Sequence, residues 1–225
     1  MKNTLAALAA FLLASQAQAA SWEPGKHYTE LPQAQRTNVS AGKVEVMEVF
    51  SYGCPACNRF QPVMKKIKAS LPAHAQVVYL PASWQPSENW PLFQRAYLTA
   101  QSLGIADKTH DDMYKAIWET GELGIVERDG RSLKRQLPSI DDAAKFYQRV
   151  AGVKAADFVN ASKSFSVDMK MKQADAQIVA MKVPSTPTLV VNGKYRINSE
   201  NMSSTNDIIE LVKFLVAKEG AAKKS

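Results

Sequence analysis

The spacing of hydrophobic and polar positions changes several times along the chain. Val44–Phe50 is β-branched and mostly apolar, which predicts a buried strand. The next segment has one apolar face at helical spacing, formed by Phe60, Val63, Met64, Ile67 and Leu71. We expect this helix to begin at Cys54 and to end at Leu71-Pro72. The apolar run Val77–Leu80 predicts a second short strand.

Helical spacing then dominates from about residue 86 to residue 182. Two apolar faces lie within 92–100 and 113–118, Phe146 and Val150 indicate a further helix, and Phe158–Met181 contains a long one. The short stretch Ile125–Gln136 includes Asp129-Gly130 and reads as a connection or a hairpin-like loop. This part of the chain therefore predicts an all-helical block.

Strand character returns near the carboxyl end. Asn192-Gly193 is typical of a type I′ turn and predicts a hairpin between Thr188–Val191 and Lys194–Ile197. An amphipathic helix through Ile208 and Leu215 closes the pattern. The order predicts an α/β fold interrupted by an all-helical insertion. We expect one discontinuous domain, residues 20–84 and 175–225, and an insertion at residues 85–174.

The first residues have the features of a secretory signal peptide. Lys2 precedes an uncharged apolar run, Leu5–Leu13, and Ala17-Gln18-Ala19 fits the small-x-small cleavage pattern. The run is too short to span a bilayer, which takes about 20 residues. We expect residues 1–19 to be the signal, cleavage after Ala19, and an exported soluble chain. The competing interpretation is a frayed N-terminal helix.

The charge of the chain does not indicate a polyanionic partner. Lys and Arg number 28 against 21 Asp and Glu, for a formal net charge of +7. The basic residues are spread along the chain and form no dense block with interleaved aromatic residues. We therefore expect a solvated basic surface and no nucleic-acid binding.

The two cysteines are the first specific sign of chemistry, and both lie in Cys54-Pro55-Ala56-Cys57. A bridge that closes so small a loop removes little entropy from the unfolded chain, so stabilisation is a poor reason for it. At the start of a helix, unpaired N–H groups and partial positive charge lower the pKa of the first sulfur. Cys54 is expected to be the exposed nucleophile and Cys57 the buried resolving partner. Pro55 suits the first helical turn.

Three other interpretations of a lone Cys-x-x-Cys compete with redox chemistry. A zinc site needs two further ligands, whereas His27, His74 and His110 are scattered without ligand spacing. A copper carrier usually has Met-rich surroundings, and the eight Met residues are dispersed. The third alternative is an inert surface disulfide. We expect no metal and no organic cofactor.

Three blocks of the chain, taken together and in order, resemble the periplasmic disulfide-forming DsbA family of the thioredoxin superfamily. The first block is Trp22-Glu23-Pro24-Gly25-Lys26-His27-Tyr28. The second runs from Glu48 through Cys57, and the third is Ser185-Thr186-Pro187-Thr188-Leu189-Val190-Val191-Asn192-Gly193-Lys194-Tyr195. The resemblance covers most of the chain after residue 19. It implies a thioredoxin fold with an inserted helical domain.

The resemblance implies roles for two further sites. Thr186-Pro187 would be a cis peptide that faces the disulfide and offers the backbone of Thr186 to an extended substrate. Pro184 is the competing proline, and an ordinary trans turn is the alternative. Glu48 would lie beneath the disulfide and help to move the proton of Cys57, since burial raises the pKa of a carboxyl group. Alternatively, Glu48 faces water at a strand end, as Glu45 would.

The chain departs from the family pattern at two places. Ala56 stands where many members have a histidine, so the disulfide is expected to be somewhat less oxidising. Some members pair the buried acid with a lysine in the following strand, and here that strand is Val77-Val78-Tyr79-Leu80.

The resemblance implies a monomeric periplasmic oxidase. It would donate the Cys54–Cys57 disulfide to unfolded or partly folded exported proteins with free cysteines. A DsbB-like membrane oxidase would then reoxidise it. The nearest alternative is a disulfide reductase or isomerase on the same scaffold, which Thr186 would fit equally well. Another is a thioredoxin-like chaperone or binding module whose disulfide is structural.

Aromatic residues near the helical block give a weaker expectation about substrate binding. Trp84, Trp90, Phe93 and Phe165 are candidates to line a groove near the disulfide, and core packing is the alternative for each.

Overall fold

The computed structural model describes residues 22–127 and 129–222, so the expected signal peptide and its cleavage site lie outside the described residues. A five-stranded sheet has the order β1-β5-β4-β2-β3. Its strands are β1 (Tyr28–Glu30), β2 (Val44–Phe50), β3 (Ala75–Pro81), β4 (Thr188–Val191) and β5 (Tyr195–Ile197). Only β2 and β3 pair in parallel, and the other neighbours in this sheet are antiparallel.

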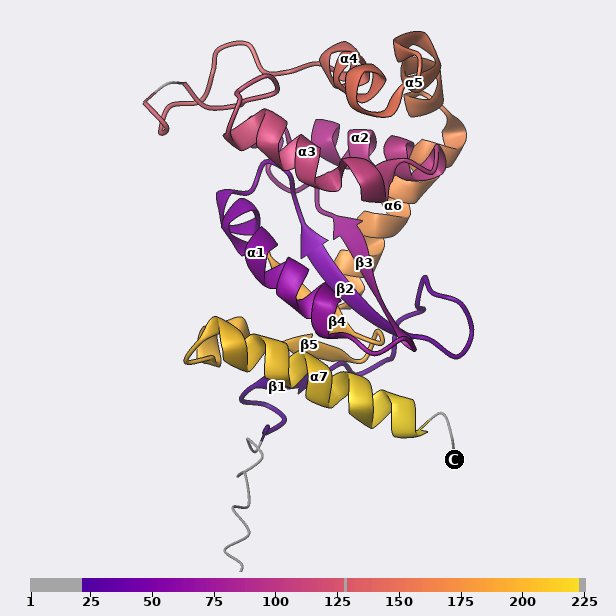
Figure 1. The fold of residues 1–225 in the computed structure, drawn as a ribbon, viewed down its shortest axis with the longest axis vertical. Coiled ribbons are helices and arrows are strands. Elements are labelled where there is room, and N and C mark those ends of the chain that lie inside the picture. Colours follow the sequence, from indigo (N-terminus) through magenta and orange to yellow (C-terminus); the bar gives the residue numbers. More distant parts are fainter. Residues whose placement is uncertain (1–21, 128, 223–225) are drawn as a thin grey trace, which may run out of the picture.

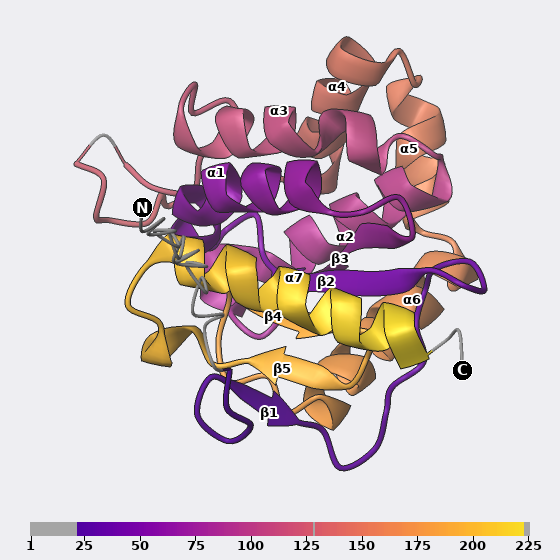
Figure 2. The same ribbon diagram turned by 60° about the horizontal axis from the view of Figure 1, so that its bottom comes forward.

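The inner strand β2 is buried at all seven positions, because both faces of the sheet are covered. Helices α1 (Pro55–Ser70) and α7 (Thr205–Ala222) lie side by side against one face (Figures 1 and 2). Val44 and Val46 belong to the core on that side. Met47 and Val49 belong to a second core, shared with the helical block. The helix that begins at the end of β2 is therefore anchored to the most buried part of the molecule.

The helical block forms a layer at one end of the sheet (Figure 1). It consists of α2 (Trp90–Ser102), α3 (Ala106–Trp118), α4 (Ile140–Ala151), α5 (Ala155–Ser162) and α6 (Phe165–Ala180), and α6 runs back from this layer alongside the sheet. The structure confirms the predicted α/β fold with an all-helical insertion. The domain boundaries stay a prediction, and α6 continues through residue 174.

The hydrophobic pattern does not predict strand β1, because three residues are too few to show a period, and its pairing with β5 is what makes it a strand. The long helix expected within Phe158–Met181 is confirmed as α6, and Phe158 itself belongs to α5. A new helix starts after Ser164, whose hydroxyl accepts the N–H of Val167.

Two turn predictions are confirmed by backbone geometry. Asn192 and Gly193 both have positive φ, 51° and 63°, as a type I′ turn requires. The stretch Ile125–Gln136 contains an antiparallel bridge between Val126 and Leu133, which makes it hairpin-like. Among the helices of residues 22–127 and 129–222, none has the length and apolar character needed to cross a membrane.

Candidate active site

Cys54 caps the N-terminus of α1, directly after the turn that follows β2. Its sulfur accepts the backbone N–H of Cys57 at 3.3 Å, and its carbonyl accepts the N–H of Asn58 at 3.1 Å. Pro55 occupies the first turn, where a missing N–H costs nothing. Both cysteines are free thiols in this structure. The sulfur of Cys54 therefore sits where unpaired helix N–H groups and the helix dipole favour a thiolate.

The expectation that Cys54 is exposed is wrong, since only 5% of its surface is accessible. The segment that leads into α2 packs against the preceding Gly53. A Cβ at Gly53 would lie 2.8 Å from Cδ1 of Trp90 and 2.9 Å from the carbonyl oxygen of Glu88. On another side, the Cys54 thiol lies 3.6 Å from the carbonyl oxygen of Thr186. A reactant can therefore reach Cys54 only at the small part of its surface that is accessible.

The two thiols have opposite pKa shifts. The pKa of Cys54 is lowered to about 6, chiefly by a hydrogen bond from the side chain of Cys57 and against the effect of burial. The Thr186 side chain and the backbone N–H groups of Cys57 and Ala56 contribute to this lowering. Burial raises the pKa of Cys57, and the neighbouring Cys54 and Glu48 raise it more. At neutral pH, Cys54 is mostly a thiolate and Cys57 a thiol.

The Thr186–Pro187 peptide bond is cis and faces Cys54. The loop also borders a cavity of about 320 Å³ between α1 and α7. Its lining is mostly apolar and includes Phe60, Thr186, Pro187, Leu189, Ile197 and Ile208. Thr186 thus contacts the Cys54 thiol and also lines the mostly apolar cavity.

Glu48 is fully buried in β2, six positions before Cys54, and does not face water. Neither of its carboxylate oxygens has a hydrogen-bond partner among the described residues. Burial raises the pKa of Glu48 well above its ordinary value, and the negative charge on Cys54 raises it further. Glu45 is also buried rather than water-facing, with one oxygen bound to the backbone N–H of Asn38. The site of Glu48 therefore favours the protonated form of its carboxyl group, and this group interacts electrostatically with both thiols.

Helix α3 supports the turn before Cys54 through residues that sequence reasoning missed. Trp118 donates its indole N–H to the carbonyl of Tyr52 at 2.8 Å, and Tyr114 donates its hydroxyl to the carbonyl of Ser51 at 3.5 Å. The Tyr52 hydroxyl and Nδ1 of His110 are 3.0 Å apart. His110, Tyr114 and Trp118 follow each other at intervals of four, and that spacing is the only signal in the sequence that could have identified them.

The four aromatic candidates for a groove do not lie together on one surface. Trp90 and Phe93 are buried in the core that α2 shares with the sheet. Trp84 is 39% exposed, with its ring centroid 5.8 Å from that of Trp90, whereas Phe165 is 79% exposed at the start of α6. Of the four, Trp90 approaches the turn before Cys54, through Gly53. Within residues 22–127 and 129–222, no group of three or more His, Cys, Asp or Glu side chains is arranged to hold a metal.

The chain is similar to known proteins over nearly its whole length. Residues 39–211 match the family model described as thioredoxin. Two relatives are named thiol:disulfide interchange protein DsbA. That of Pseudomonas aeruginosa is 31% identical over 215 residues, 96% of this chain and 94% of the relative. That of Pseudomonas syringae pv. tomato is 32% identical over 229 residues, 100% and 99% of the two chains.

A solved structure has the same arrangement. The crystal structure of oxidoreductase DsbA from Xylella fastidiosa superposes with a TM-score of 0.76 at 30% sequence identity, covering 88% of this chain and 98% of that one.

Proposed function

Because the chain belongs to the DsbA family of thioredoxin-fold thiol:disulfide oxidoreductases, we propose that its Cys54–Cys57 pair works as an oxidase of other proteins. The observation that carries this direction is the pKa of Cys54, about 6, beside the raised pKa of Cys57. A thiolate stabilised in the reduced protein favours the reduced form, and so favours giving the disulfide away.

The reaction begins with the Cys54–Cys57 disulfide and a thiolate of the substrate. The thiolate attacks the sulfur of Cys54, the bond between Cys54 and Cys57 breaks, and Cys57 leaves with the electron pair. A mixed disulfide joins the substrate to Cys54. We propose that the backbone of Thr186 pairs with an extended substrate, and the 3.6 Å between its carbonyl oxygen and the Cys54 sulfur in the reduced protein supports this.

The leaving thiolate of Cys57 needs a proton, since the pKa of that buried thiol is raised. We propose Glu48 as the acid that supplies it, because burial raises the pKa of its carboxyl group and so favours the protonated form. A second substrate thiolate then attacks the substrate sulfur of the mixed disulfide. Cys54 leaves as a thiolate, and the substrate gains a disulfide while the protein keeps two electrons.

The cycle closes only if another protein takes up those two electrons. We propose a DsbB-like membrane oxidase for this step and the periplasm as the compartment, with the substrates being exported proteins that carry free cysteines. The mostly apolar lining of the cavity beside Pro187 supports these partners, because such a lining would bind apolar side chains of an unfolded chain or of a membrane protein.

The test is disulfide donation to a reduced, unfolded protein, and the loss of free thiols from that protein measures it. The oxidised wild type is expected to transfer one disulfide per chain, and Cys54→Ser is expected to transfer none. Cys57→Ala has no internal disulfide, so Cys54 is first joined to a small thiol as a mixed disulfide. A substrate thiolate that attacks the Cys54 sulfur displaces the small thiol and stays bound to Cys54, which identifies the substrate. If the oxidised wild type transferred no disulfide but both it and Cys57→Ala bound the unfolded protein, the chain would act as a binding module. If only the reduced wild type acted, and only on disulfides, it would be a reductase or isomerase.

A further inference from the structure

One edge of the sheet is open and lies at the floor of a cavity away from the thiols. Strand β3 is the last strand in the sheet order and pairs only with β2. The backbone N–H of Ala82 donates to Phe50 at 2.7 Å, which fixes the phase of this parallel ladder. Alternate residues face the partner in such a ladder, so residues 76, 78 and 80 point their backbone groups at β2. Val77 and Tyr79 point theirs at the open edge.

The open part of the edge is short and ends at defined points. At its carboxyl end, Pro81 has no N–H, and its carbonyl accepts Nε2 of Gln94 at 3.0 Å. Among the described residues, β2 is the only backbone partner of β3 between Gln76 and Leu80. Two N–H and two C=O groups, those of Val77 and Tyr79, therefore remain for another chain. They are the groups that one extended strand of a few residues would pair with.

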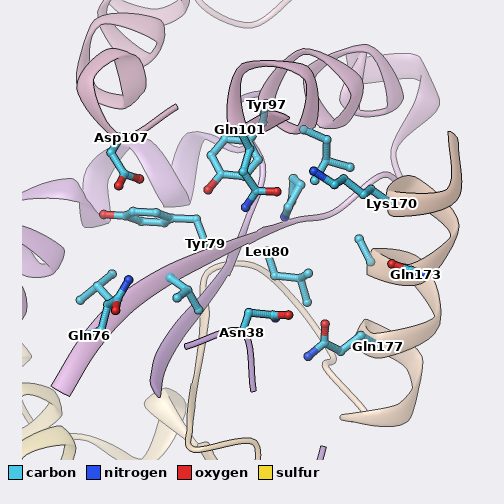
Figure 3. A pocket seen from close by; sticks show the side chains of 15 residues that line it. Asn38, Gln76, Tyr79, Leu80, Tyr97, Gln101, Asp107, Lys170, Gln173 and Gln177 are labelled. Atoms are coloured by element: carbon cyan, nitrogen blue, oxygen red, sulfur yellow. The ribbon is translucent and has the colours of Figure 1, made fainter. Parts of the chain in front are cut away.

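The cavity over this edge has a volume of about 410 Å³, and its walls come from helices α2, α3 and α6 and from the segment before β2 (Figure 3). Helix α2 contributes Gln101, helix α6 contributes Gln173 and Gln177, and the segment before β2 contributes Asn38 (Figure 3). A carboxamide carries both a donor and an acceptor, as a peptide group does. With only Lys170 and Asp107 as charged residues in its lining, the cavity suits a neutral polar chain rather than an ion.

We propose that the β3 edge is a second binding site, which takes an extended segment of the polypeptide substrate by strand addition. This inference rests on the proposed function, because an unfolded substrate is what supplies free backbone groups. The segment pairs with Val77 and Tyr79 and presents its remaining peptide groups to the carboxamides of the walls. The thiols play no part in this contact. It holds a substrate chain while its cysteines reach Cys54.

The walls favour a single extended chain over a second copy of this protein. Edge-to-edge pairing of two sheets needs an edge that another sheet can approach. Here α2 and α6 rise on one side of β3, and Asn38 closes the other end (Figure 3). Gln177 also donates to the carbonyl of Arg36 at 3.3 Å, which ties the wall of α6 to the segment before β2. A lone strand enters such a trench, whereas a whole sheet is kept out.

The test uses the oxidised full chain and a blocked, cysteine-free decapeptide of alternating threonine and valine with a lysine at each end. Amide exchange and chemical shifts are followed by NMR. A peptide of the same length with proline at alternate positions is the control, since it lacks half of the ladder donors. We expect the first peptide to slow exchange at Val77 and Tyr79 and the proline peptide to leave it unchanged.

Two variants test the site itself. Val77→Pro removes an outward N–H, which an edge strand tolerates, and Val77→Ile keeps it. We expect Val77→Pro to weaken peptide binding about tenfold or more and Val77→Ile to change it less than about twofold. Gln173→Trp fills the groove from an exposed position of α6, so it tests the site even if Val77→Pro does not fold. It is also expected to weaken binding about tenfold.

Three results would overturn the inference. The peptide leaves Val77 and Tyr79 unaffected, or it perturbs only the cavity beside Pro187, or protection at β3 grows with protein concentration in the absence of peptide. The last would mean that a second copy occupies the edge. Because the probe has no cysteine, none of these results bears on disulfide donation, which the preceding experiment tests separately.

Discussion

The sulfur of Cys54 lies 3.6 Å from the carbonyl oxygen of Thr186, although 132 positions separate the two residues. This contact joins the N-terminus of α1 to the loop before β4. Helix α1 follows β2 in the chain, and β4 pairs with β2 in the sheet. The position of the loop therefore decides both what a substrate backbone can reach and how well the thiolate is stabilised.

Thr186→Val keeps the size and the backbone of the loop and removes the hydroxyl group. Because the Thr186 side chain lowers the pKa of Cys54, we expect this pKa to rise by about half a pH unit. The reduction potential should fall by about 15 mV, since the reduced form loses that stabilisation. Thr186→Ser is the matched control and should keep both values. An unchanged thiolate pKa in Thr186→Val would show that the hydroxyl does not act on Cys54.

The thiolate of Cys54 can be observed directly by its ultraviolet absorbance in the reduced protein. We expect a titration midpoint near pH 6, and no such transition in Cys54→Ser. The pKa is depressed in the fold, so the thiolate stabilises the reduced protein fully above the pKa of an unfolded cysteine. That stabilisation is lost as pH falls toward 6. A midpoint above pH 8 would mean that the helix terminus leaves the thiol unactivated.

Glu48→Gln tests the buried acid. The folded pKa of Glu48 is raised, so the wild type loses stability as pH rises above the ordinary carboxyl value, when only the unfolded chain ionises. Between pH 4 and pH 7.5, we expect the unfolding free energy of the variant to rise relative to that of the wild type. Urea unfolding at the two pH values measures it. Parallel pH dependence in the two proteins would place Glu48 in contact with water.

His110 gives the opposite pH dependence. Burial lowers the pKa of His110 to about 3, so the folded protein holds this side chain neutral. The unfolded chain takes up a proton below about pH 6.5, and the wild type should then lose about 1.4 kcal/mol of stability per pH unit from this residue down to pH 3. His110→Phe should flatten the acid side of the stability profile. Identical acid limbs in urea unfolding would contradict this.

Much of the fold follows from local sequence signals. The apolar run of β2, the periodic face of α1 and the Asn192-Gly193 turn each specify their own structure, since burial, periodicity and positive φ are properties of a few adjacent residues. Strand β1 carries no such signal, because β5 provides its pairing from far along the chain.

The candidate site was predictable where residues stand close together and not where distant segments meet. Cys54 and Cys57 are three positions apart at a helix start, so their roles could be inferred. The low exposure of Cys54 was not predictable, because the parts of the chain around it are distant in sequence. Thr186 contacts the Cys54 sulfur, and Trp90 packs against the neighbouring Gly53. The cavity at the open edge of β3 was likewise not predictable, because its walls come from α2 and α6, which are distant from β3 in sequence.

The reduction potential of the Cys54–Cys57 pair, measured by equilibration with glutathione at pH 7, tests the oxidase role most directly. A low pKa of Cys54 beside a high pKa of Cys57 predicts a value at or above that of protein disulfide isomerase, about −180 mV. A value near that of thioredoxin, about −270 mV, would contradict the oxidase role and make the chain a reductase.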